Sequence, residues 1–160
     1  MSTLLYAVYG AVATITLNRP QVLNALDEPM IVRLREVCEQ ARDDSSVRAV
    51  VLAGNGPAFM AGGDVALFHS QLPRLPQMVE RLARELHFAI LALRRAPKPV
   101  IASVHGACAG AAVSLVAAAD FAIAADDAQF RLPTASSERV PTGAALISCR
   151  ACWAAAKRSS

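Results

Sequence analysis

Two short alternating apolar runs open the chain, and a glycine separates them. They occupy residues 4–9 and 12–17, with Gly10 between them, which predicts a β-hairpin. Apolar residues then recur at helical spacing after Asp27, a good N-cap residue, which predicts a helix that ends at about Asp43. The apolar stripe of this helix consists of Met30, Leu34, Val37, Cys38 and Ala41.

Strands and helices alternate through the rest of the chain as far as about residue 125. Two mostly apolar runs, 47–53 and 100–104, predict buried strands, and we expect the first to be buried on both faces. The remaining patterns predict helices over 65–72, 77–95 and 111–119, a tight turn over 106–110 and a last strand over 121–125. This alternation predicts an α/β layered domain.

The pattern changes near the end of the chain. From about residue 131 the apolar periodicity weakens, so we expect a core over residues 1–130 and an atypical tail over 131–160. Our hypothesis is that this tail is out of frame or truncated. Its Cys149-Arg150-Ala151-Cys152 motif has no second cysteine pair and no later histidine, so we interpret it as coincidence rather than as a redox or zinc site.

Composition excludes several classes of protein. The 160 residues are 54% hydrophobic and 18% charged, which excludes a disordered chain. The net charge of +3 comes from scattered residues, so nothing favours a nucleic-acid partner. Residues 100–119 have the length of a membrane span but consist mainly of Ala, Gly and Ser, which predicts a buried strand, turn and helix instead. Four cysteines do not make a secreted disulfide scaffold, so we expect a soluble cytoplasmic protein without membrane contact.

A loop rich in small residues, 54–64, directly follows the first buried strand. It does not fit a dinucleotide-binding fingerprint, because Phe59 stands where the third glycine would be. One interpretation is a flexible turn. The other is a backbone that approaches a ligand closely, since Ala61, Gly62 and Gly63 have little or no side chain to cover their N–H groups.

A second such loop, 106–111, separates a strand from a helix. Its Gly-Ala-Cys-Ala-Gly sequence imitates the nucleophile elbow of α/β-hydrolases with Cys108 as nucleophile. That reading needs a later histidine, and the three histidines all precede Cys108, so it is a distant alternative. The other use of this loop is the helix that begins near Ala111, whose first N–H groups have no partner within the helix.

The two loops together suggest an oxyanion hole. Each follows a buried strand and each offers one backbone donor, and two N–H groups that converge on one carbonyl oxygen stabilise a developing enolate or tetrahedral anion. This arrangement requires the loops to meet in space, which the spacing does not decide.

Several motifs lie in order between residues 4 and 130. They are Asn18-Arg19-Pro20, Asn24-Ala25-Leu26, Phe59-Met60-Ala61-Gly62-Gly63-Asp64, Lys98-Pro99-Val100-Ile101-Ala102, His105-Gly106 and Gly110. In this order they resemble the crotonase superfamily, the enoyl-CoA hydratases and isomerases. The resemblance implies a crotonase-like ββα spiral of the α/β class, incomplete at its C-terminus.

The resemblance also implies an activity. The N–H groups of Ala61 and Ala111 would be the oxyanion donors, and the substrate-binding residues would be Ala61, Gly62, Gly63, Asp64 and Ala111. The substrate would be an acyl-CoA thioester in fatty acid metabolism, with coenzyme A as part of the substrate and neither a separate cofactor nor a metal. A lyase or isomerase reaction through an enolate, and assembly into a homo-oligomer, would follow.

The sequence departs from the family pattern at two places. Ser114 occupies the position of the family's catalytic glutamate, and a serine hydroxyl does not serve as a carboxylate base. After residue 130 the family carries its other catalytic acid, whereas Glu138 is the only carboxylate in the tail and no family motif surrounds it. The competing interpretation is therefore an inactive acyl-CoA-binding protein or a fragment without activity.

Overall fold

A five-stranded sheet forms the centre of the molecule in a computed structural model that describes residues 2–132. The strands follow the order β1-β2-β3-β4-β6, with β1 and β2 antiparallel and the other neighbours parallel. Their bounds are β1 Leu4–Tyr9, β2 Val12–Leu17, β3 Ala49–Gly54, β4 Val100–Val104 and β6 Phe121–Ala124. The predicted hairpin, α/β class and strand alternation are confirmed.

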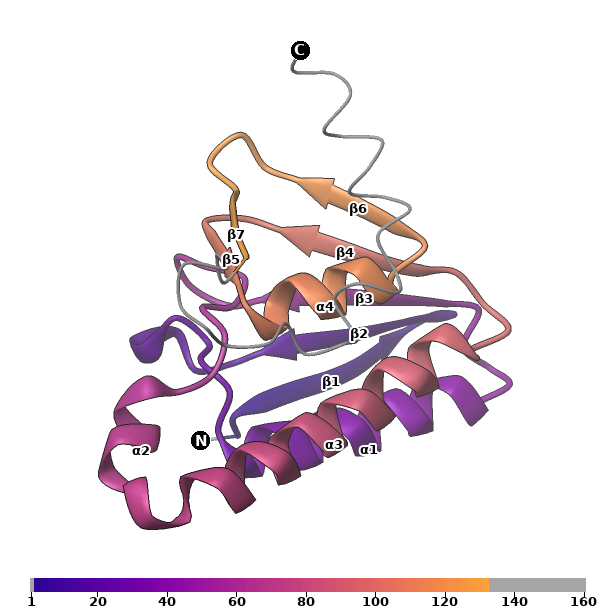
Figure 1. The fold of residues 1–160 in the computed structure, drawn as a ribbon. Coiled ribbons are helices and arrows are strands. Elements are labelled where there is room, and N and C mark those ends of the chain that lie inside the picture. The colour runs from indigo at the N-terminus through magenta and orange to yellow at the C-terminus, as the bar shows by residue number, and fades with distance from the viewer. Residues whose placement is uncertain (1, 133–160) are drawn as a thin grey trace.

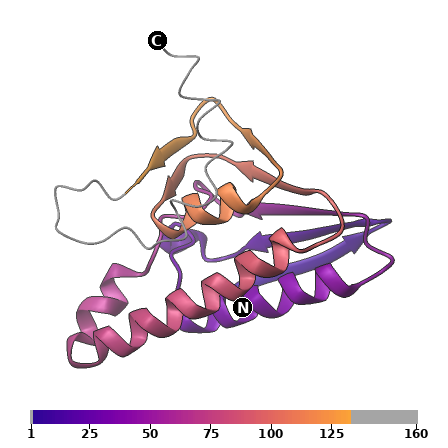
Figure 2. The same cartoon turned by 45° about the vertical axis from the view of Figure 1, so that its right-hand side comes forward.

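Helices connect the parallel strands, and two of them lie side by side along the sheet (Figures 1 and 2). The helices are α1 Glu28–Asp43, α2 Val65–Ser70, α3 Leu75–Arg94 and α4 Ala111–Ala118, with single 3-10 turns η1 Pro20–Val22 and η2 Leu72–Arg74. The strand order advances in one direction. Right-handed crossovers therefore place successive helices on the same face of the sheet.

Burial of the strands alternates because the described helices cover one face. Val50 and Leu52 of β3 are buried, whereas Val51 between them is only partly covered. The expectation that this strand is buried on both faces is therefore wrong for the described residues. Strand β6 lies at the edge of the sheet, and its Phe121 and Ile123 side chains are 63% and 66% exposed.

The first helix follows the sequence prediction at both ends. The Asp27 carboxylate accepts a hydrogen bond from the Met30 N–H at 2.9 Å, which caps the start of α1. At the other end, the Lys98 ammonium donates to the carbonyls of Ala41 and Asp44 at 2.8 and 2.7 Å. The buried face of the helix consists of Met30, Ile31, Leu34, Val37, Cys38 and Ala41.

The sequence prediction missed two short strands. Strand β5, Ala107–Ala109, lies within the predicted tight turn, and it pairs in parallel with β7, Gln129–Arg131. Three residues are too few to show a period, and the pairing joins segments about 20 residues apart, so no local signal marks either strand. Strand β7 also extends the regular structure to Arg131, the first residue of the predicted tail.

Residues 100–119 divide into β4, β5 and α4, which confirms the predicted strand, turn and helix in outline. Within residues 2–132, no helix combines the length and the apolar character that crossing a bilayer requires. The predictions for the Cys149 and Cys152 motif, for Glu138 and for residues 133–160 in general lie outside the described residues.

Candidate functional site

The two small-residue loops meet in space. The Phe59 N–H donates to the His105 carbonyl at 2.8 Å, and the Met60 N–H donates to the Ala107 carbonyl at 3.0 Å. The Ala109 N–H returns a bond to the Met60 carbonyl at 2.9 Å, so Met60 and Cys108 form a parallel bridge. These bonds supply the juxtaposition that an oxyanion hole requires and that the sequence spacing left open.

Glycines make this approach possible. Gly62 has a φ of 100°, and a Cβ at this position would lie 3.1 Å from the Ala109 carbonyl oxygen and 3.9 Å from the Gly110 Cα. Gly110 itself has a φ of 56°. A larger residue at either position would require a strained backbone, and at Gly62 it would also press on the opposite loop. The glycines at 62 and 110 therefore allow the loops 54–64 and 106–111 to lie in close contact.

The second loop ends in an open helix terminus. Helix α4 begins at Ala111, its N-cap is Gly110, and no side chain caps it. Among the residues that the structure describes, none accepts a hydrogen bond from the Ala111 N–H. This N–H is therefore available to an acceptor beyond the helix end, where the helix dipole favours negative charge.

The Ala61 N–H, which the resemblance suggests as an oxyanion donor, is hydrogen-bonded within the chain. Its N–H donates to the Leu23 carbonyl at 2.9 Å, so its proton already has a partner within the chain. Ala61 therefore does not offer a free donor in this structure, which gives its expected role as an oxyanion donor no support. Sequence reasoning had no signal for this bond, because it joins residues 38 positions apart and depends on the left-handed conformation of Leu23, whose φ is 53°.

Gly63 provides a free amide two residues later. The Leu26 N–H donates to the Gly62 carbonyl at 2.7 Å, and the Asp64 N–H donates to the Leu26 carbonyl at 3.0 Å. In such a parallel bridge, the flanking residues bond to the partner segment while the N–H of the middle residue points away from it. The Gly63 N–H accordingly has no acceptor within residues 2–132.

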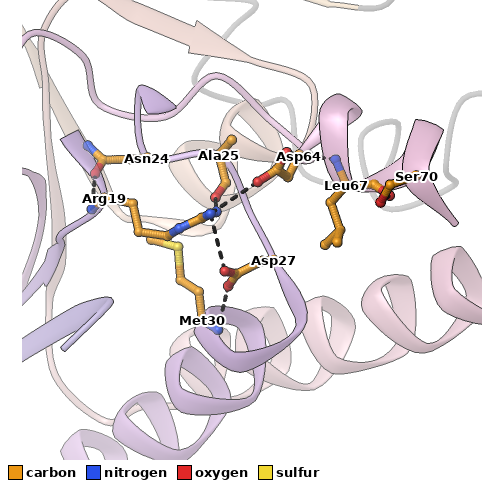
Figure 3. Close-up of polar contacts among 8 residues, drawn as sticks. All are labelled: Arg19, Asn24, Ala25, Asp27, Met30, Asp64, Leu67 and Ser70. Carbon is orange, nitrogen blue, oxygen red and sulfur yellow. Dashed lines mark hydrogen bonds and ion pairs between the residues drawn. The ribbon is translucent and has the colours of Figure 1, made fainter. Parts of the chain in front are cut away.

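The Asp64 carboxylate is committed to the fold. One oxygen accepts from the Leu67 N–H at 3.1 Å and caps α2, and the other lies 3.1 Å from Arg19 Nη2 (Figure 3). Both carboxylate oxygens thus have partners within the chain, and the expected contact of the Ala61–Asp64 segment with acyl-CoA stays a prediction. The carboxylate therefore connects the end of the loop to Arg19 and to the start of α2.

Arg19 and Asn24 stand out in the sequence only as members of the two early motifs. The Asn24 side chain is completely buried, and its amide nitrogen donates to the carbonyls of Asn55, Ala58 and Phe59 at 2.8–3.1 Å. Its amide oxygen accepts from the Arg19 N–H at 2.8 Å. Asn24 therefore fastens the first motif to the loop after β3, a role that no local pattern indicates.

The two reactive side chains at or near the second loop, Ser114 and Cys108, are both buried. Ser114 lies on α4, one turn after Gly110, and is 4% exposed. Cys108 lies within β5 with no exposed surface. A nucleophile elbow instead needs its side chain exposed at the apex of a turn, so the geometry gives the hydrolase reading no support.

The sequence of the chain matches a known protein family. Residues 7–151 match the Enoyl-CoA hydratase/isomerase family. The chain belongs to this family. The match extends beyond residue 131 into the segment that we expected to be atypical.

Relatives of the enoyl-CoA hydratase/isomerase family differ in substrate. The chain is 38% identical to trans-2-decenoyl-[acyl-carrier-protein] isomerase of Streptococcus mutans over 128 residues, which cover 79% of this chain and 49% of that protein. It is 37% identical to 1,2-epoxyphenylacetyl-CoA isomerase of Escherichia coli over 134 residues, which cover 81% and 50%. The chain thus spans about half the length of the curated relatives it matches.

A solved structure confirms the fold expected from the crotonase resemblance. The crystal structure of an enoyl-CoA hydratase from Mycobacterium smegmatis matches with a TM-score of 0.73 and 43% identity, over 80% of this chain and 49% of that one. The α/β arrangement of the described residues is therefore that of the crotonase fold.

Proposed function

We propose that this protein binds an acyl-CoA thioester and holds its carbonyl oxygen between the N–H groups of Gly63 and Ala111. The single observation that supports this is the meeting of the two loops, because it brings an amide without an internal acceptor from each loop to one region of the molecule. Ala61 leaves the donor pair, since its N–H is bonded to Leu23. Gly62 and the remaining residues of the segment would contact the thioester.

Two such donors would stabilise an enolate. Negative charge moves onto the thioester oxygen when a proton leaves or a nucleophile adds along the acyl chain, and each fixed donor contributes about 2.7–4 kcal/mol to the stability of that charge. Coenzyme A would enter as part of the substrate, so the reaction needs no separate cofactor. This is hydratase or isomerase chemistry, in agreement with the family of the chain.

A second function is supported by Ser114. A buried hydroxyl at the position of the family's glutamate does not activate water as a carboxylate does, so the site would polarise a thioester without turnover. In that case the protein is an acyl-CoA-binding pseudoenzyme.

A hydration assay with crotonyl-CoA separates these functions. The unchanged protein, Ser114→Glu and the matched control Ser103→Glu, at an exposed position on β4, would be compared for hydration and for binding of crotonyl-CoA and coenzyme A. We expect binding in the unchanged protein and the control, and faster hydration only in Ser114→Glu. Hydration by the unchanged protein would contradict the pseudoenzyme, and absence of binding to either ligand would contradict both functions.

Assembly and location are also proposals. The family resemblance supports a homo-oligomer in the cytoplasm that takes part in fatty acid metabolism. Sedimentation of the purified protein tests the first, with a purely monomeric species as the contrary result.

A further inference from the structure

Arg19 grips both segments of the bridge that contains Gly63. Its Nη2 lies 3.1 Å from Asp64 Oδ2 and 3.3 Å from Asp27 Oδ2, and its Nη1 donates to the Ala25 carbonyl (Figure 3). Asp64 directly follows Gly63 on one segment. Ala25 directly precedes Leu26, the bridge partner of Gly63, on the other. The Arg19 guanidinium therefore contacts both segments that form the Leu26–Gly63 bridge.

Partial burial strengthens the interactions among the charges of Arg19, Asp27 and Asp64, so the loss of one charge would disturb the other two. The side chains of Arg19, Asp27 and Asp64 are 15%, 16% and 14% exposed, so water screens them far less than it screens a surface ion pair. Two carboxylates share one cation. Removal of the guanidinium would leave the two negative charges facing each other in a poorly solvated position, and their repulsion would separate Asp64 from the start of α1.

We propose that Arg19 is a positioning residue for the reacting carbonyl. Through Asp64 and the Ala25 carbonyl it sets the direction of the Gly63 N–H, and it leaves the Ala111 donor on the other loop untouched. This inference rests on the proposed function, in which Gly63 is one of the two donors. A merely structural arginine would support stability without affecting how strongly the thioester carbonyl is polarised.

The first test needs no ligand. Amide resonances and hydrogen exchange would be compared in the unchanged protein, Arg19→Lys and the control Arg35→Lys. Lysine keeps the charge of Arg19, but a single ammonium does not reproduce the forked contacts to both carboxylates and a carbonyl. Arg35 is a suitable control because it also pairs with a partly buried carboxylate, Glu85 at 3.2 Å, between α1 and α3.

We expect a local response. In Arg19→Lys the amide resonances of Leu26, Gly63 and Asp64 shift, and the bonded amides of Leu26 and Asp64 exchange faster. The Ala111 amide is unchanged, and Arg35→Lys alters none of these signals. Unchanged bridge amides in Arg19→Lys would overturn the inference.

The second test measures the carbonyl itself. Crotonyl-CoA labelled with ¹³C at the thioester carbonyl reports polarisation as a change in chemical shift on binding. We expect a downfield shift in the unchanged protein and in Arg35→Lys, and a shift close to that of the free thioester in Arg19→Lys. Any turnover would fall by about 10²-fold, the order expected for a misplaced catalytic contact.

The outcomes separate the two proposals. A full carbonyl shift in Arg19→Lys overturns the positioning role and leaves the proposed function intact. No carbonyl shift in the bound unchanged protein overturns the proposed function, and the positioning role with it. If Arg19→Lys does not fold, Asp64→Asn replaces it, because this variant keeps the cap to Leu67 while removing the charge that Arg19 holds. A full shift in Asp64→Asn likewise overturns the inference.

Discussion

Replacement of Asn24 by alanine tests whether one buried amide holds the loop after β3. The side chain is 0% exposed, donates to the carbonyls of Asn55, Ala58 and Phe59, and accepts from the Arg19 N–H. Alanine removes every one of these bonds and leaves the backbone partners without replacement. The residue also has a φ of 55°, a conformation that asparagine tolerates better than alanine.

The expected loss of stability follows from these contacts. Two amide protons shared among three carbonyls, together with one accepted bond, amount to three full hydrogen bonds. At about 0.5–1.5 kcal/mol each they contribute roughly 1.5–4.5 kcal/mol. The left-handed backbone adds about 1 kcal/mol for alanine. We therefore expect the free energy of unfolding to fall by about 2.5–5.5 kcal/mol.

Urea unfolding followed by far-ultraviolet circular dichroism measures this difference. With a slope of about 2 kcal/mol/M, the midpoint falls by roughly 1.3–2.8 M. Asn18→Ala is the matched control, because Asn18 belongs to the same motif region but its side-chain bonds to Ser2 and Asn55 are exposed, so we expect a loss below about 1 kcal/mol. If the two variants lie within about 1 kcal/mol of each other, the reasoning from buried hydrogen bonds is refuted.

Two further predictions concern the end of α1. Lys98→Met keeps the apolar stem but removes the ammonium that bonds to the Ala41 and Asp44 carbonyls. We expect the free energy of unfolding, measured by urea titration, to fall by about 1–2 kcal/mol. An unchanged midpoint would contradict the capping role. The pKa of Asp44 is lowered from 3.8, first because the Ser46 side chain donates to its carboxylate and then because the Ser46 N–H does so. Its stabilising contribution is therefore present above pH 3.8 and is lost as the pH falls through the lowered pKa. Asp44→Asn should show a weaker loss of stability over that acidic range, and an identical pH profile would count against this assignment.

Local patterns were sufficient for the main elements. The apolar spacing and the Asp27 cap predicted α1, and the Gly10 turn predicted the first hairpin, because these features depend on neighbours within a few residues. The helix start at Ala111 and the small-residue loops were also visible. They mark where backbone amides lack both side-chain cover and helical partners.

Local sequence patterns do not decide which backbone N–H of the first loop is free to act as a donor. Ala61 and Gly63 are equally plausible from sequence, since both lie in the same run of small residues. Only the bond from Ala61 to Leu23 removes one of them, and the bridge to Leu26 directs the N–H of the other away from Leu26. The support from Arg19 to Asp64 spans 45 residues and was invisible for the same reason.

The sequence by itself determined the elements, the order of the motifs and the two loops able to offer backbone donors, because helical and strand periods and glycine conformations are local properties. Only the tertiary structure decided that the loops touch, which amide remains free and which side chains support it. These are outcomes of contacts between distant segments, where each N–H bonds to the acceptor that folding brings within reach.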